Sequence, residues 1–149
     1  MDDPTTPAAK TPWHLWVVGA VSLLWNAMGA LDFTMTQLKN EAYLKALTPE
    51  QLAYIANFPL WAVLAWGVGT WGSLVGSLLL LARKGLAYHL FLASFVGMLL
   101  TFTQNYFLSD WLKVMKGGAG AVVFTLVIVL IASLLLFYSR AMRGRGVLR

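Results

Sequence analysis

The sequence has no cysteine and little charge. Charged residues make up 11% of its 149 positions and hydrophobic residues 59%, with a mean hydropathy of +0.70. Soluble domains average about 25% charged and about 45–50% apolar residues. The absence of cysteine excludes disulfide bonds, thiolate metal sites and a cysteine nucleophile. The composition therefore indicates an integral membrane protein.

The motifs that mark enzymes are also missing. The sequence has no paired carboxylates, nucleophile elbow, phosphate-binding glycine loop or metal-ligand spacing. We therefore expect no enzymatic activity, no bound metal and no cofactor. A haem between His14 and His89 is the one alternative, but both rings are more simply explained as side chains at the membrane boundary. The formal charge of +5 forms no nucleic-acid-binding motif, so we expect no nucleic-acid partner.

Four apolar runs are each long enough to cross about 30 Å of hydrocarbon at about 1.5 Å per residue. Pro12 and Pro59 directly precede the first two runs, where a missing amide hydrogen costs a helix start little. The second and third runs are so close together that they must form an antiparallel hairpin. The sequence predicts an all-α integral membrane protein, a single four-transmembrane-helix bundle at 13–139 with spans at 13–35, 60–82, 86–108 and 121–138.

Basic residues are distributed unequally between the two sides of this predicted bundle. Seven fall on the side of both termini and four on the other, and cytoplasmic loops carry the excess of lysine and arginine. Both termini are therefore predicted to be cytoplasmic, with 1–12 as a flexible tail and 140–149 as a basic tail. Asp2 and Asp3 stand where a secretory signal would need positive charge, which favours the first run as a permanent span.

The two loops predicted on the outer side carry helix signals. In the first loop, Thr48, Pro49 and Gln51 fit a capping box with proline at the first helical position. In the second, Ser109 is expected to cap a short helix that ends at the glycine pair beginning with Gly117. Each short helix has an apolar face, so we expect amphipathic helices on the membrane surface or on the outer end of the bundle.

Polar side chains within the apolar spans are the predicted ligand-binding residues. In the first span, Asn26 shares one helical face with Ser22 and Gly29, and Asp32 follows. In the third span, Thr101 and Gln104 share a face with Ser94 and Gly97, and Asn105 lies beside it. We expect both polar stripes to face the bundle interior. We predict that they form a polar vestibule in the outer half, which holds a small polar solute or an ion. The alternative is that Asp32 is a carboxylate at the water boundary and that the amides join helices, at about 0.6 kcal/mol each.

The second span combines tryptophans with small residues. Trp66 and Trp71 lie deep enough to line a ligand pocket, although filling volume is the more frequent role of such side chains. The small residues let another helix approach closely, either from the same chain or from another subunit. The predicted helix-packing residues are Gly69, Gly72, Ser73 and Gly76.

Three stretches support a family resemblance: PWHLWVVGAVSLLWNAMGALDFTMTQ at 12–37, YLKALTPEQLAY at 43–54 and FPLWAVLAWGVGTWGSLVGSLLLLAR at 58–83. In these stretches the chain resembles a family of small four-span proteins of alphaproteobacterial inner membranes, and the likeness covers nearly the whole chain. Members are labelled as hypothetical membrane proteins, and some as sugar transporters by automated naming. The resemblance implies a four-span fold in the bacterial inner (cytoplasmic) membrane, and it supplies no functional residues.

Two functions fit these features. The first is a small transporter or solute-binding protein that acts as a homo-oligomer, because four helices give little room for alternating access. Small multidrug exporters of similar size work around a carboxylate in their first helix, which directs attention to Asp32 by analogy. The second is an accessory or assembly subunit of a larger membrane complex, whose packing face and deep tryptophans bind another protein, lipid or pigment. The lipid bilayer is a partner in both.

Overall fold

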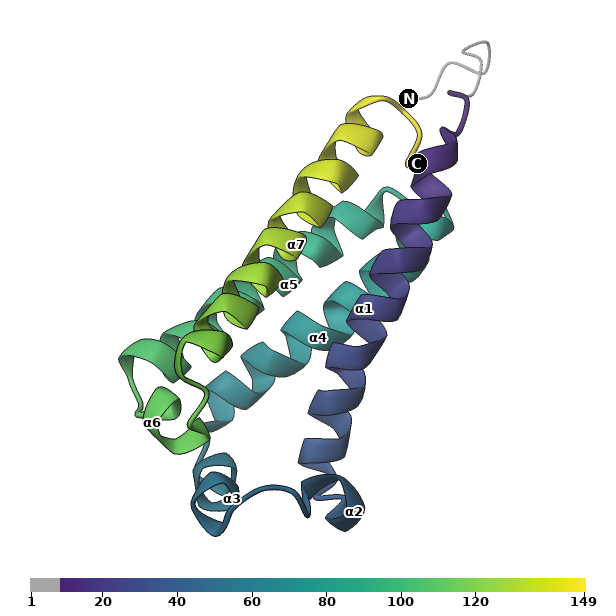
Figure 1. Cartoon of the computed structure of the whole chain (residues 1–149). Helices are drawn as coiled ribbons and strands as arrows, with labels where there is room; N and C mark the ends of the chain where they lie inside the picture. The colour runs from purple at the N-terminus through teal and green to yellow at the C-terminus, as the bar shows by residue number, and fades with distance from the viewer. Residues whose placement is uncertain (1–8) are drawn as a thin grey trace.

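The computed structural model describes residues 9–149, so most of the predicted tail at 1–12 lies outside the described residues. Within residues 9–149 the chain contains helices and no strand (Figure 1). The helices are α1 (Trp13–Gln37), α2 (Glu41–Leu44), α3 (Pro49–Ala56), α4 (Leu60–Leu81), α5 (Leu86–Phe107), α6 (Trp111–Met115) and α7 (Gly118–Gly144).

Four helices, α1, α4, α5 and α7, are long and apolar enough to cross a membrane. This confirms the prediction of an all-helical chain with four candidate spans, and the bounds of α1, α4 and α5 agree with the predicted spans to within two residues. The fourth helix is longer at both ends than the predicted 121–138. It continues through Arg140 and Arg143, because a change from apolar to charged side chains does not interrupt backbone hydrogen bonding.

The long helices are packed in the order α1, α4, α5, α7 (Figure 1). The largest interface joins α4 to α5, and a four-residue turn at 82–85 connects them. Arg83 ends α4 in the left-handed region with a φ of 57°. We call the end of the molecule with this turn, where α1 also begins and α7 ends, the basic end. The opposite end, where α2, α3 and α6 lie, is the loop end (Figure 1).

Close approach of two backbones forms the α4–α5 interface. A Cβ atom added to Gly97 would lie 2.5 Å from the carbonyl oxygen of Ala65 and 3.0 Å from the amide nitrogen of Gly69. The absence of a side chain at Gly97 is therefore what lets α5 lie against α4 at this depth.

The remaining predicted packing residues lie on α4. A Cβ atom on Gly72 would meet the Ser94 hydroxyl, and one on Gly76 would meet the Phe91 ring, both on α5. Ser73 instead accepts a hydrogen bond from α1 through its carbonyl oxygen. Of the two alternatives for the small-residue face, the structure thus shows packing against helices of the same chain.

The buried core lies at the basic end, where all four long helices contribute. Its members are Leu15, Leu80, Ala87, Phe91, Leu135, Met142, Val147 and Leu148. Val147 and Leu148 follow α7. The next residue, Arg149, is hydrogen-bonded to the α4–α5 turn through its backbone. Its N–H donates to the carbonyl oxygen of Arg83 (2.8 Å), and its carbonyl oxygen accepts from the N–H of Gly85 (2.7 Å).

The segment predicted as a basic tail, 140–149, is therefore built into the fold. Gly146, with a φ of 69°, turns the chain back towards the bundle after α7 ends. Val147 and Leu148 then lose nearly all contact with solvent. The arginines made this segment look like a charged tail, but burial of Val147 and Leu148 holds the segment against the bundle.

The connections at the loop end contain the short helices α2, α3 and α6. α3 begins with the capping box at Thr48, as its sequence signal indicates. α6 starts differently from the prediction, because Asp110 takes the N-cap position and the Ser109 hydroxyl bonds back to α5. Gly118 also differs: it does not follow the short helix but begins α7.

Candidate functional site

The structure does not gather the predicted vestibule residues at one site. Asn26 lies between α1 and α4, Asp32 lies on an exposed surface beside α2, and Gln104 and Asn105 lie beneath α3 and α6. Thr101 is buried and donates its hydroxyl proton to a carbonyl of its own helix. The physical reason is the packing order: α1 packs on α4 and not on α5, so the polar faces of α1 and α5 meet different neighbours.

Asn26 joins α1 to α4. Its side-chain amide donates to the hydroxyl of Ser77 at 2.9 Å and lies 3.3 Å from the carbonyl oxygen of Ser73. Asn26 is 8% exposed and Ser77 is fully buried. Both groups are hydrogen-bonded inside the protein, so the Asn26 amide links α1 to α4.

Asp32 is paired with a tyrosine of the neighbouring loop helix. The Tyr43 hydroxyl of α2 donates to the Asp32 carboxylate at 2.6 Å, and both side chains are exposed. This hydrogen bond, with smaller contributions from burial and the carboxylate charge, raises the pKa of Tyr43 from 10.0 to about 12. Asp32 therefore links the end of α1 to α2 and is not among the residues that line the loop-end pocket described below.

The raised pKa of Tyr43 gives a titration test of this contact. Below pH 10 the phenol is protonated in both folded and unfolded chains, so the hydrogen bond is fully present; it is lost as the pH rises towards 12. We expect the ultraviolet difference titration between the wild type and Tyr43→Phe to show a midpoint near 12. In an Asp32→Asn background the midpoint should fall towards 10. An equal midpoint in both backgrounds would contradict the contact.

A shallow, open pocket of about 330 Å³, with more apolar than polar lining surface, lies at the loop end, between α3, α6 and the adjoining ends of α4 and α5. This volume is near the lower limit of ligand pockets, which is about 300 Å³. Its polar groups are one carboxylate, two amides and two hydroxyls, and no basic side chain lines it. The lining residues are Glu50, Ala53, Tyr54, Asn57, Phe58, Pro59, Gln104, Ser109 and Val114.

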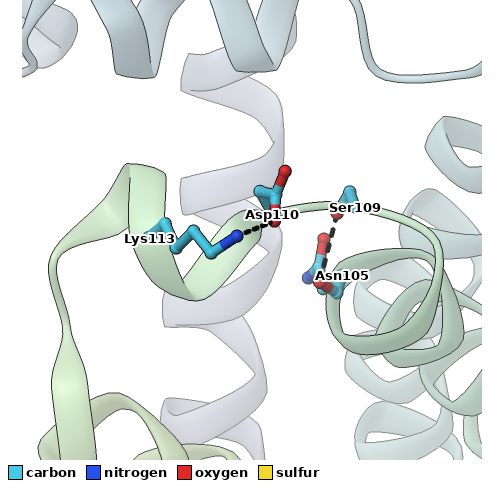
Figure 2. Close-up of polar contacts among 4 residues, drawn as sticks. All are labelled: Asn105, Ser109, Asp110 and Lys113. Carbon is cyan, nitrogen blue, oxygen red and sulfur yellow. Dashed lines mark hydrogen bonds and ion pairs between the residues drawn. The ribbon is translucent and has the colours of Figure 1, made fainter.

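Two lining residues, Tyr54 and Ser109, belong to a hydrogen-bonded cluster with Asn105, which lies behind them and is not itself a lining residue. The Tyr54 hydroxyl donates to the side-chain oxygen of Asn105 at 3.0 Å and lies 2.8 Å from the Ser109 hydroxyl. Figure 2 shows the Ser109 side chain directed towards Asn105, and its hydroxyl lies 3.1 Å from the backbone carbonyl oxygen of that residue. The neighbouring Asp110 forms an ion pair with Lys113 instead. Burial raises the pKa of Tyr54, and the Ser109 hydrogen bond lowers it by less. The phenol is therefore neutral and can position Asn105.

The two deep tryptophans occupy different surroundings. Trp66 packs edge-on against Phe33 and Phe58, with ring centres 5.1 Å and 6.4 Å away, so it supports a pocket-lining ring without lining the pocket itself. Trp71 is 46% exposed, and its indole N–H donates to the Thr34 hydroxyl at 3.2 Å. It borders a wholly apolar groove on α4, so the two tryptophans share no site.

The two histidines are each hydrogen-bonded to a different residue of α7. The His14 ring nitrogen lies 2.6 Å from the Tyr138 hydroxyl, and His89 lies 3.0 Å from the Arg143 guanidinium. Each ring thus has a protein partner of its own. Within residues 9–149 no group of three or more His, Asp or Glu side chains lies close enough to hold a metal ion.

Most pocket residues come from the first of the two loops that are predicted to hold amphipathic helices. Tyr54, Asn57 and Phe58 lie in or just after α3, and Ser109 lies before α6. The capping box located α3 along the chain, but helical periodicity alone did not show which of its faces meets α5. The available signal was the pair Tyr54 and Asn57, polar groups placed on the inner face of an amphipathic helix.

Comparison of the chain with protein-family models, curated proteins and solved structures finds no match.

Proposed function

We propose that this chain is a non-enzymatic, multi-pass protein of the bacterial inner membrane that binds a small hydroxyl-bearing solute in the pocket at the loop end. The observation that supports this most directly is the convergence of Gln104, Tyr54 and Ser109 on one cavity of about 330 Å³. The excess of basic residues at the opposite end favours the loop end as the outer side. The pocket then opens to the periplasm, and the amphipathic α3 and α6 cover it.

The chemistry of the lining indicates the class of solute. Carboxylate, amide and hydroxyl oxygens accept hydrogen bonds from solute hydroxyl groups, and the Phe58 ring offers a flat apolar surface. A strongly anionic solute fits poorly, since Glu50 is the one charged lining residue. The resemblance to proteins labelled as sugar transporters agrees with a hydroxyl-rich solute. The close α4–α5 contact at Gly97 leaves no gap between these two helices, which favours binding over conduction.

Replacing Gln104 tests the pocket. We expect Gln104→Ala to weaken solute binding about tenfold, since a hydrogen bond to a partly buried amide contributes about 1 kcal/mol or slightly more. Mass spectrometry identifies the solutes that remain bound after gentle extraction. Equilibrium dialysis of the protein in nanodiscs then measures the affinity of the wild type and of each variant, with D-glucose and glycerol as the added probes. Gln37→Ala is the matched control, because Gln37 is an exposed glutamine at the end of α1.

Two results would contradict the proposal. One is equal binding by the wild type and Gln104→Ala. The other is loss of binding in Asp32→Asn with Gln104→Ala unaffected, which would place the solute at Asp32, as the analogy with small exporters implies. Circular dichroism of each variant separates loss of binding from loss of folding.

The exposed surface of α7 favours a second candidate function, a subunit of a larger membrane complex. In the most apolar stretch of α7, 6% of the residues are buried inside the protein. The corresponding fraction in the other three long helices is 22–33%. Leu126, Leu130 and Phe137 are more than half exposed. A partner helix on this surface would co-purify after mild extraction, whereas recovery of the isolated chain would favour the solute-binding role.

A further inference from the structure

The two ends of the molecule differ completely in electrostatic balance. At the loop end, four acidic and four basic residues cancel. At the basic end, no described residue is acidic. Within residues 9–149 the one ion pair is Lys113–Asp110, at the loop end. The basic residues at the basic end are Lys10, Arg83, Lys84, Arg140, Arg143, Arg145 and Arg149.

Arg143 is held in a defined orientation where α7 meets α5. Its guanidinium donates to the Nε2 atom of His89 at 3.0 Å, and its central carbon lies 5.6 Å from the centre of the Tyr88 ring. Arginine has no acceptor, so His89 must receive this bond on an unprotonated nitrogen. Two neighbours on α5 thus hold the guanidinium, while the Arg143 side chain remains exposed to solvent.

Arg140 extends the same surface. It precedes Arg143 by three residues on α7, so the two side chains lie one above the other, and Arg140 is also exposed. Other arginines of this end are directed elsewhere: Arg83 donates to Thr11 and Arg149 donates to Gly146. Arg140 and Arg143 are therefore two neighbouring exposed positive charges beside α5, and neither has an acidic partner among the described residues.

Apolar side chains continue from this seam towards the middle of the helices. Leu136 of α7 precedes Arg140 by four residues and Arg143 by seven, so it lies below both arginines and is partly buried. Phe137 lies beside it, three residues before Arg140, and is 65% exposed. Two arginines above apolar side chains, at the end of a helix able to cross a membrane, match the layout of a phospholipid: a charged head above hydrocarbon chains.

We infer that the α5–α7 seam at the basic end binds an anionic phospholipid, with Arg143 and Arg140 contacting its phosphate and with Phe137 and Leu136 along an acyl chain. Arginine suits this role because its planar fork binds two phosphate oxygens at once. Tyr88 and His89 are positioning residues that hold the Arg143 fork towards the headgroup. The inference does not depend on the solute pocket, which lies at the other end.

The test uses the purified full chain and native mass spectrometry with phosphatidylglycerol, phosphatidylcholine or inorganic phosphate. We expect phosphatidylglycerol to bind more tightly than phosphatidylcholine, and Arg143→Gln to weaken it about fivefold, as a single basic residue near a membrane surface does. Arg140→Gln should act similarly. Lys45→Gln, which removes one positive charge from the exposed loop end, should leave binding unchanged.

Several outcomes would overturn the inference. These are equal binding of the two lipids, unchanged binding in both arginine variants, an equal loss in Lys45→Gln, or retention of inorganic phosphate as strong as that of the lipid. Since a variant that fails to fold would lose binding for another reason, thermal unfolding is measured for each. Arg143→Lys adds a further check: it keeps the charge but loses the fork, so it should retain part of the affinity.

Discussion

Gly97→Ala is expected to lower the free energy of unfolding by about 2–3 kcal/mol, in the upper part of the range for overpacking a tight interface. The added methyl group would lie 2.5 Å from the Ala65 carbonyl oxygen and 3.0 Å from the Gly69 nitrogen. Both are backbone atoms, so no side-chain rotation relieves the overlap, and α4 and α5 must separate. Thermal unfolding in mild detergent, followed by circular dichroism, measures the effect.

Gly120→Ala is the matched control for this substitution. Gly120 also lies within a long helix, but no atom lies within 4 Å of its added Cβ. Alanine has the higher helix propensity, so this variant should be neutral or more stable by up to roughly 1 kcal/mol. Equal effects of the two substitutions would show that α4 and α5 are not in backbone contact at Gly97.

Leu148→Ala should destabilise the chain by about 2–4 kcal/mol, as is usual for a leucine truncated in a packed core. Leu148 is 3% exposed and packs in the core of the basic end, although it follows the last helix. Thermal or denaturant unfolding measures the loss. The backbone bonds between Arg149 and the α4–α5 turn should weaken with it, so amide exchange at Gly85 is expected to accelerate.

Leu134→Ala provides the control for this second substitution. Leu134 is 59% exposed on α7, so its truncation leaves no cavity and should change stability by less than about 0.5 kcal/mol. If residues 140–149 formed a detached basic tail, Leu148→Ala would be equally silent. The difference between the two leucine variants therefore distinguishes a docked segment from a free one.

The number and approximate bounds of the long helices could be predicted from the sequence because their causes are local. Hydrophobic length determined four candidate spans, and Pro12 and Pro59 marked two starts. α7 was predicted too short because Arg140 and Arg143 resemble a boundary in composition, whereas its backbone remains helical to Gly144.

The candidate site was less predictable, because its residues are brought together from distant positions in the chain. Gln104 could be identified as polar within an apolar helix, and it lines the pocket. Tyr54 and Ser109, which lie 2.8 Å apart, are separated by 55 positions in the sequence. The spacing of polar and apolar residues within either segment does not predict that contact.

The sequence by itself determined an all-helical chain with four membrane-length helices, and the concentration of positive charge near one end, since these depend on composition and run length. Tertiary structure decided which polar groups are neighbours. α1 packs on α4 and not on α5, and this separates Asn26 and Asp32 from Gln104. A polar stripe shows which face of a helix turns inward, but the helix it meets is set by packing across the whole bundle.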